Sequence, residues 1–259
     1  MFSRLLHERI RPVEVLQERL GTRVERAVWR GEQVLVKTLT SDDPEMIMRF
    51  QREGDIAARL STHPNIVPLL GHTRTQLIYR FIEGGDLRCK FERGVLEVRE
   101  AVDLMRGLMA AIGHAHARGI THLDLKPENI LLEGGRVRVT DFGLSHDRAA
   151  PRITRLGERF GTPHYMPPEQ YKGVRNDPRS DLYSAGVILF EALAGTPPYR
   201  DPFSWLAGIR DERVPLPHPQ ALHPLLEMAL ARDPARRPSS AIAFLIELER
   251  AAEQLRLDG

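Results

Sequence analysis

The alternation of apolar and polar residues changes character along the chain. Between Val13 and Leu39, valines recur at strand-like intervals, and the tetrad at residues 30–33 (R-G-E-Q) predicts a tight hairpin turn. Asp43 and Pro44 then signal the start of a helix, because aspartate is a favoured N-cap and proline is tolerated at the first helical position. The apolar residues that follow at helical spacing are Met46, Ile47, Phe50, Ala57 and Leu60. These patterns predict a small antiparallel sheet with one main helix.

A second part of the chain is predominantly helical. Two further strands are predicted over residues 66–70 and 77–82, before the polar and glycine residues 83–86 interrupt the pattern. Apolar stripes at helical spacing then predict helices over residues 100–118, 181–193, 222–231 and 239–255. Strands first and helices later indicate an α+β fold with two lobes.

The predicted lobes belong to one domain that covers residues 1–259. We expect an N-terminal lobe at about 11–82, a hinge at about 80–86 and a C-terminal lobe at about 87–255. A cleft between two such lobes is a favoured place for a nucleotide.

Composition and charge exclude several classes of protein. The 259 residues have a net charge of +2, with 42% hydrophobic and 28% charged residues, which is ordinary for a globular domain. This balance does not indicate nucleic acid as a partner, and no run is apolar enough to predict a membrane segment. The single cysteine, Cys89, excludes an internal disulfide and fits a reducing compartment, so we expect a cytoplasmic location.

The most informative stretch runs from His122 to Gly143 and combines two carboxylates, an amide and an ammonium. Asp124 and Lys126 share a loop that a following proline keeps out of helix. Asn129 opens an apolar run, a Gly-Gly turn reverses the chain, and Asp141 follows the second strand. The hairpin therefore brings Asn129 and Asp141 side by side, with Asp124 just before them. Oxygen ligands of this kind suit Mg²⁺, which proteins hold through one or two carboxylates together with phosphates.

This stretch resembles the catalytic segments of protein kinases. The kinase pattern H-R-D-x-x-x-x-N matches residues 122–129 (H-L-D-L-K-P-E-N), and D-F-G matches residues 141–143. Residues 161–169 (G-T-P-H-Y-M-P-P-E) resemble the end of a kinase activation segment, which shapes the floor on which a peptide lies. Asp181 resembles the buried aspartate that anchors the catalytic loop, and Arg237 resembles the arginine that pairs with the glutamate at position 169.

The resemblance implies a two-lobed kinase fold and an activity. The form D-L-K-P-E-N is similar to Ser/Thr kinases, and the compact, arginine-rich chain is similar to bacterial eukaryotic-like Ser/Thr protein kinases. The implied reaction transfers the γ-phosphoryl group of Mg-ATP to Ser or Thr hydroxyls of a protein substrate, the kinase itself included. By the same resemblance, Asp124 is the catalytic base and Lys126 stabilises the transferring group. Asn129 and Asp141 would hold Mg²⁺, with Mn²⁺ as an alternative.

A nucleotide site is implied on the N-terminal side of these residues. Lys37, at the end of V-L-V-K, is similar to the kinase lysine that contacts the α and β phosphates, and Glu53 to its ion-pair partner. The resemblance further implies backbone hydrogen bonds to adenine from Arg80 and Ile82, and ribose contact from Asp86. The remaining residues implied to bind the nucleotide, all in the predicted sheet, are Leu20, Gly21, Val28 and Leu35.

Besides Pro167, which stands where the motif at residues 161–169 has alanine, four positions depart from the kinase pattern. Arg23 and Arg26 stand where the second and third glycines of the phosphate-covering loop are expected, Leu35 replaces a small alanine, and Leu123 replaces the arginine of H-R-D. A pseudokinase, acting as a regulatory or scaffold domain with weak nucleotide binding, is therefore the alternative to an active enzyme. The peptide-floor motif disfavours a small-molecule kinase. The sequence predicts neither the substrate protein nor the oligomeric state.

Overall fold

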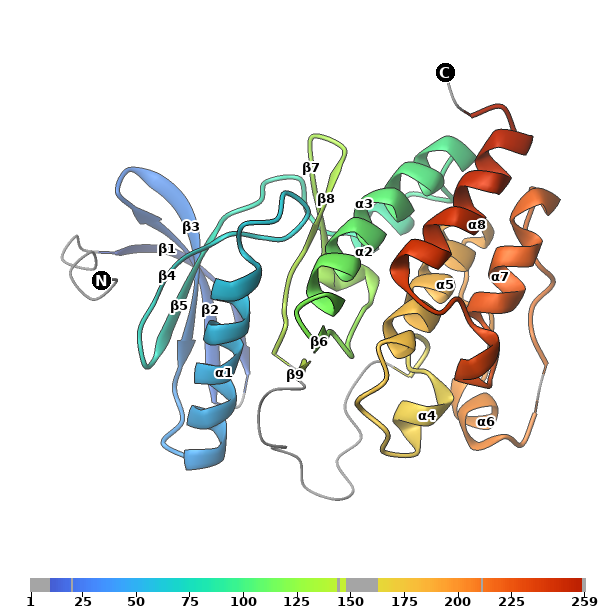
Figure 1. Ribbon diagram of the computed structural model, residues 1–259. Helices are drawn as coiled ribbons and strands as arrows, with labels where there is room; N and C mark the ends of the chain where they lie inside the picture. The colour runs from blue at the N-terminus through green and yellow to red at the C-terminus, as the bar shows by residue number, and fades with distance from the viewer. Residues whose placement is uncertain (1–9, 20, 144, 148–162, 211, 258–259) are drawn as a thin grey trace.

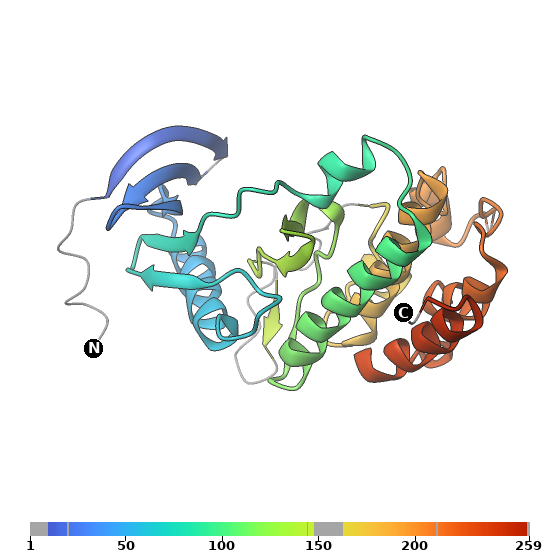
Figure 2. The same cartoon turned by 90° about the horizontal axis from the view of Figure 1, so that it is seen from above.

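The computed structural model describes residues 10–19, 21–143, 145–147, 163–210 and 212–257. Figure 1 shows a sheet with one long helix on one side of the molecule and a larger helical part on the other. Figure 2 shows from above that a short hairpin in the middle of the chain lies between these two parts. The predicted two-lobed α+β architecture is confirmed.

The N-terminal lobe is built on an antiparallel five-stranded sheet with the order β1-β2-β3-β5-β4. Its strands are β1 (Arg11–Arg19), β2 (Thr22–Trp29), β3 (Glu32–Leu39), β4 (Leu69–His72) and β5 (Gln76–Arg80). Directly opposed residues of neighbouring strands share a face, and successive residues of one strand alternate between faces. In the β2–β3 pair Val24 lies opposite Lys37 and Arg26 lies opposite Leu35, so these four side chains share one face.

The face that contains Leu35 packs against helix α1 (Pro44–Leu60). Asp43 caps this helix, because its side chain accepts a hydrogen bond from the Glu45 amide at 3.0 Å. Phe50 and Ala57 of α1 share an apolar cluster with Leu35. The predicted helix start is therefore confirmed, and the helix lies where it can reach the cleft.

The C-terminal lobe consists of helices and two short strand pairings, β6 with β9 and β7 with β8. Its helices are α2 (Leu87–Phe91), α3 (Val98–His116), α4 (Pro168–Tyr171), α5 (Arg179–Ala194), α6 (Pro202–Ala207), α7 (His223–Ala229) and α8 (Ala241–Gln254). Its strands are β6 (Ile120–Thr121), β7 (Ile130–Glu133), β8 (Arg136–Val139) and β9 (His146–Asp147), and its 3-10 turns are Pro127–Asn129, Gln220–Leu222 and Pro234–Arg236. In helix α5 every residue from Ser180 to Ala192 is buried, as its almost wholly apolar sequence predicts.

The two lobes are joined behind the cleft by backbone pairing. The amide of Val67 donates to the carbonyl of Val139 at 2.9 Å, and the amide of Val139 donates to the carbonyl of Asn65 at 2.8 Å. The Asn65 side-chain amide also donates to the carbonyl of Val137 at 3.0 Å. Leu60, at the end of α1, packs in the core of the C-terminal lobe. The segment after α1 thus belongs structurally to the C-terminal lobe, which we also call the lower lobe, the N-terminal lobe being the upper lobe.

The predicted helices over residues 100–118, 181–193, 222–231 and 239–255 are present with ends that differ by up to two residues, and the N-terminal lobe differs from the prediction at three places. The strand predicted over residues 66–70 begins only at Leu69, because Ile66 forms an isolated parallel bridge with Val139 instead. The strand predicted over residues 77–82 ends at Arg80, where the connection to the lower lobe begins. The predicted phosphate-covering loop with Arg23 and Arg26 is also wrong, because both residues lie inside the regular strand β2.

Candidate active site

The loop that follows β6 is fixed by one buried carboxylate. Asp181 of α5 accepts hydrogen bonds from the amide of His122 at 2.8 Å and from the amide of Leu123 at 2.9 Å. His116, at the end of α3, places its Nε2 at 2.8 Å from the same carboxylate. Burial alone would raise the pKa of Asp181, but the hydrogen bonds from His116 and His122 outweigh burial and lower it. An ionised Asp181 therefore sets the backbone of the catalytic loop.

Leu123 adopts a conformation that is unusual for a leucine. Its φ angle is +66°, in the left-handed region that costs a residue with a Cβ about 1–2 kcal/mol. Its amide is held by Asp181, and its carbonyl accepts a hydrogen bond from the buried Gln170 side chain at 2.8 Å. The arginine-to-leucine replacement therefore leaves the backbone fixed from two sides. Gln170 is a positioning residue that the sequence interpretation missed.

The predicted catalytic residues meet on this loop. Lys126 Nζ lies 2.9 Å from Asp124 Oδ2. The Asn129 amide nitrogen donates to the Asp124 carbonyl at 2.8 Å and to its Oδ2 at 3.2 Å. Because the nitrogen of Asn129 is directed at Asp124, its Oδ1 is the atom left to contact a cation. Asp124 is thus oriented by an ammonium and an amide.

Asp141 follows β8 and faces the upper lobe. Its φ angle is +59°, and its Oδ1 accepts a hydrogen bond from the Gly143 amide at 3.3 Å. A Cβ at position 143 would lie 3.0 Å from both Asp141 Oδ1 and Glu53 Oε2, so glycine gives these carboxylates room. The ring of Phe142 packs against the ring of His122, with the centroids 4.6 Å apart. Asp141 is therefore held beside the catalytic loop.

Lys37 connects the two lobes electrostatically. Its Nζ lies 2.7 Å and 2.8 Å from the two carboxylate oxygens of Glu53, and 3.8 Å from Asp141 Oδ1. Burial would lower the pKa of Lys37, but the two carboxylates outweigh burial and raise it. The Lys37 ammonium in turn lowers the pKa of Asp141. The structure thus brings Lys37, Glu53 and Asp141 together as a charged cluster in the cleft.

The hinge residues are placed by backbone contacts. The amide of Arg80, the last residue of β5, donates to the carbonyl of Pro68 at 3.0 Å. Ile82 is buried two residues later. Asp86 caps α2 by accepting a hydrogen bond from the Cys89 amide at 2.9 Å.

The residues implied for the roof of the nucleotide site do not all lie together. Leu20 lies outside the described residues. Gly21 packs against α1, where a Cβ would meet Met46 Cε at 2.1 Å. Val28 lies opposite Gln33 beside the β2–β3 turn. Seven residues of extended strand separate positions 21 and 28, a span of about 23 Å, so one nucleotide base does not contact both.

The residue opposite Lys37 is Val24, which the sequence interpretation did not choose. Counting outward from the Arg30–Gly31 turn gives this pairing. Tyr79, opposite Leu35 in β5, is buried, and its hydroxyl forms a hydrogen bond with Glu53. Val24 and Tyr79 therefore border the space between Lys37 and the hinge.

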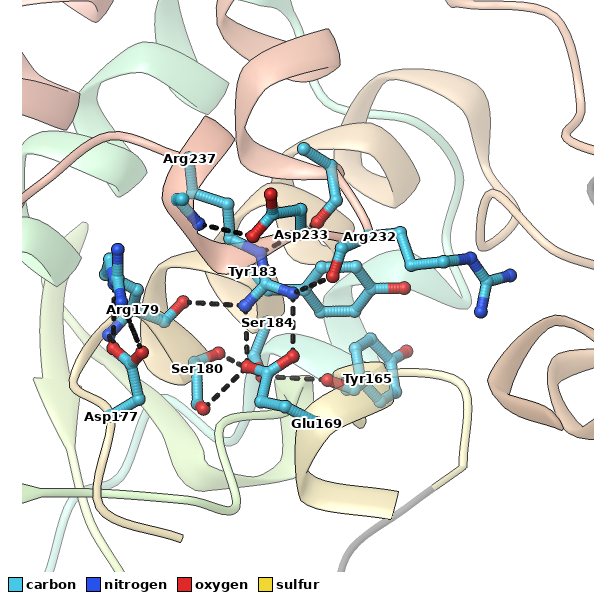
Figure 3. A network of polar contacts seen from close by, with 12 residues as sticks. Tyr165, Glu169, Asp177, Arg179, Ser180, Tyr183, Ser184, Arg232, Asp233 and Arg237 are labelled. Carbon is cyan, nitrogen blue, oxygen red and sulfur yellow. Dashed lines mark hydrogen bonds and ion pairs between the residues drawn. The ribbon is translucent and has the colours of Figure 1, made fainter. Parts of the chain in front are cut away.

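A buried ion pair supports the peptide side of the site. Figure 3 shows Glu169 between Ser180 and Arg237. Arg237 donates to the two oxygens of Glu169 at 2.6 Å and 2.8 Å, and the Ser180 hydroxyl donates to the same carboxylate at 2.8 Å. The Arg237 side chain is fully buried, with 0% exposure, and its guanidinium lies 4.8 Å from the ring centre of Tyr183. Glu169 and Arg237 thus fix the helix that ends the peptide floor.

Comparison with known proteins agrees with this geometry. A family model described as the protein kinase domain matches residues 21–248. The chain belongs to the protein kinase family. The curated relatives are serine/threonine-protein kinases of bacteria, in agreement with the resemblance seen in the sequence.

Three relatives illustrate how far the similarity extends. Serine/threonine-protein kinase pkn3 of Myxococcus xanthus is 34% identical over 86% of this chain and 45% of the relative. The corresponding values are 32%, 87% and 37% for PrkC of Bacillus subtilis, and 36%, 80% and 33% for PknD of Mycobacterium tuberculosis. The kinase domain described here thus spans less than half the length of these relatives. Kinases of this family use ATP and a divalent metal.

Proposed function

We propose that this domain is an active Ser/Thr protein kinase, which transfers the γ-phosphoryl group of ATP to Ser or Thr hydroxyls of a protein substrate, its own chain included. The observation that supports this most is the charged cluster in which Lys37 bonds to Glu53 while Asp141 lies 3.8 Å from the same ammonium. These residues come from β3, from α1 and from the end of β8, so they meet only in one arrangement of the lobes. Three further charged or polar groups suited to phosphoryl transfer, those of Asp124, Lys126 and Asn129, would have no use in a scaffold.

The catalytic loop supplies the acid–base chemistry in this proposal. Asp124 accepts or orients the proton of the substrate hydroxyl, because its carboxylate is fixed by Lys126 and Asn129. The Lys126 ammonium, 2.9 Å from Asp124, is placed to stabilise negative charge on the transferring group. Lys37 binds the other phosphates and is held in place by Glu53.

Two hard oxygen donors fit a divalent cation in the cleft. The Asn129 Oδ1 is turned away from Asp124, and the Asp141 side chain is 47% exposed beside Lys37. Mg²⁺ is the cation we propose, with Mn²⁺ as an alternative, since Mg²⁺ sites combine one or two protein oxygens with substrate phosphates. When bound, the ion neutralises charge on the ATP phosphates.

The proposal includes a location and a partner class. Across the described ranges, no helix is both long and apolar enough to cross a membrane. The single cysteine is free and exposed, which supports our expectation of a cytoplasmic location. The partner we propose is a protein with an accessible Ser or Thr, and not a nucleic acid.

A phosphate-transfer assay tests the proposal. Wild-type protein with radiolabelled ATP and Mg²⁺ should label itself or a general protein substrate, and Asp124→Asn and Asp141→Asn should each lower the rate about 10²-fold or more. Asp103→Asn, on the solvent-exposed side of α3, is the matched control and should leave the rate unchanged. Absence of transfer by the wild type, or transfer that survives both site variants, would overturn the proposal.

A further inference from the structure

Arg88, in the first turn of α2, contacts three groups from three different elements. Its Nη1 lies 2.8 Å from Glu191 Oε1 of α5, and its Nε lies 3.1 Å from Glu128 Oε1 in the catalytic loop. Its Nη2 donates to the hydroxyl of Tyr165, in the peptide-floor motif. The Arg88 guanidinium therefore links α2 to the catalytic loop, to the peptide-floor motif and to helix α5.

The carboxylate of Glu191 depends on this contact. Its side chain is only 5% exposed, and its second oxygen accepts a hydrogen bond from the Tyr165 hydroxyl. An ionised carboxylate at this depth is costly unless a cation pairs with it. The structure supplies that cation from within the chain, through Arg88.

The contact lies on the face where a substrate peptide must lie. Glu128 directly precedes Asn129, whose amide is bonded to Asp124, and Tyr165 belongs to the floor. Arg88 and Glu128 are 28% and 41% exposed, so the pair is open to solvent on this face. A peptide that presents a hydroxyl to Asp124 therefore places its neighbouring residues close to Arg88.

We propose that Arg88 is a specificity-determining residue, which occupies an acidic subsite formed by Glu128 and Glu191 and thereby removes any requirement for a basic residue in the substrate. The inference rests on the proposed kinase activity. An arginine fork is the group that two carboxylates bind best, so without Arg88 the subsite would select an arginine from the peptide. With Arg88 in place, its positive charge disfavours that residue.

A peptide series measures this selection. Each peptide has one Ser or Thr and carries either arginine or alanine at one neighbouring position, and KM and kcat are measured separately. At every position, the wild type should have KM values for the alanine and arginine peptides that agree within about twofold, or a lower KM for the alanine peptide. Arg88→Ala should prefer arginine at one position by about tenfold, through KM and not kcat, since a charge-assisted hydrogen bond is gained there. Arg88→Ala combined with Glu128→Gln should lose most of that preference.

Three further variants or conditions keep the result decisive. Arg88→Lys keeps a cation in the subsite and should behave as the wild type. Arg106→Ala removes an ion pair with Glu249 far from the site and should create no preference. If Arg88→Ala is unstable because Glu191 is left unpaired, ethylguanidinium should raise its melting temperature more than the same concentration of sodium chloride does.

Two results would overturn the inference while leaving the kinase activity intact. The first is a wild type that prefers arginine at one position by tenfold or more. The second is a folded Arg88→Ala protein with unchanged ratios, or an unstable one on which ethylguanidinium has no specific effect. A wild type that phosphorylates none of the peptides and does not label itself would instead count against the proposed function.

Discussion

The lower and upper walls of the proposed nucleotide cleft differ in how their polar side chains are held. In the lower wall, formed by residues 122–143, the loop is fixed by Asp181, which is 1% exposed and has three hydrogen-bond donors. In the upper wall, formed by the β1–β2 hairpin, the ion pairs Arg23–Glu25 and Arg26–Glu14 are each 3.0 Å long, and the arginine side chains are 41% and 35% exposed. Buried charges therefore hold the lower wall in place. Backbone pairing holds the upper wall, and its charged side chains are exposed to solvent.

This difference teaches where the kinase tolerates substitution. Exposed ion pairs contribute about 0–1 kcal/mol, whereas removing one partner of a buried pair costs about 3–5 kcal/mol. Arg23, Arg26 and Leu35 lie in the β2–β3 pairing, whose register is unbroken, whereas the β1–β2 pairing has register shifts between Pro12 and Glu14 and between Val15 and Gln17. The one departure in the lower wall, Leu123, is compensated by Asp181 and Gln170.

The largest effect is expected from Arg237→Ala, which breaks the frame of the lower lobe. Glu169 would be left with the Ser180 hydroxyl as its remaining donor among the described contacts, so the free energy of unfolding should fall by about 3–5 kcal/mol. Urea denaturation followed by circular dichroism measures this change. Arg250→Ala, in an exposed pair with Glu247, should change it by less than about 0.5 kcal/mol. Equal effects of the two variants would refute the contrast between buried and exposed charges.

Lys37→Met should have the next largest effect, because Lys37 is the charged link between the walls. We expect kcat/KM to fall by about 10²–10³-fold, the usual loss when one fixed group that stabilises developing charge is removed. Initial rates with radiolabelled ATP give this ratio. Lys172→Met, at an exposed position after α4, serves as the control for loss of a lysine. A loss of kcat/KM below tenfold would show that the reaction does not depend on the Lys37 ammonium and its contact with Glu53.

The substitution Asp181→Asn should make the free energy of unfolding depend less on pH in the acidic range. The pKa of Asp181 is lowered in the folded state, so its contribution is present above its unfolded pKa of about 4 and is lost as the pH falls through the folded value. We expect the variant to lose about 1.5–3 kcal/mol at pH 7 and to show a smaller further loss below pH 4 than the wild type. Urea titrations between pH 7 and pH 3 measure both quantities. If the free energies of unfolding of the two proteins changed with pH in the same way, the lowered pKa of Asp181 would be contradicted.

The smallest effects are expected in the upper wall. Arg26 shares the cleft face with Leu35 and lies 5.9 Å from the ring centre of Phe81, whereas Arg23 lies on the opposite face. Arg26→Ala should therefore raise the KM for ATP by no more than about fivefold, and Arg23→Ala should leave it unchanged. ATP saturation curves distinguish the two. A larger effect of Arg23→Ala would mean that the register does not determine which arginine reaches the cleft.

The lower wall was more accessible to sequence interpretation than the upper wall. The segments at residues 122–129 and 141–143 are contiguous, so their spacing predicts which side chains meet. Val24 and Gln170 were missed because their places depend on strand register and on a contact across 47 residues of sequence. The role of Arg88 was also missed, since α2 meets α5 only after the lobe has folded.

The attachment of α1 to the lower lobe has a mechanical consequence. Because Leu60 is packed in the lower core, tilting the sheet would rotate α1 about its C-terminal end. Glu53 lies seven residues before Leu60 in this helix, a lever arm of about 10 Å. A rotation of about 10° would then displace Glu53 by about 2 Å, enough to lengthen the 2.7 Å contact with Lys37 beyond an ion pair. Small angular motions of one helix would thus make and break the ion pair of the Lys37 ammonium, the group that we propose binds phosphates.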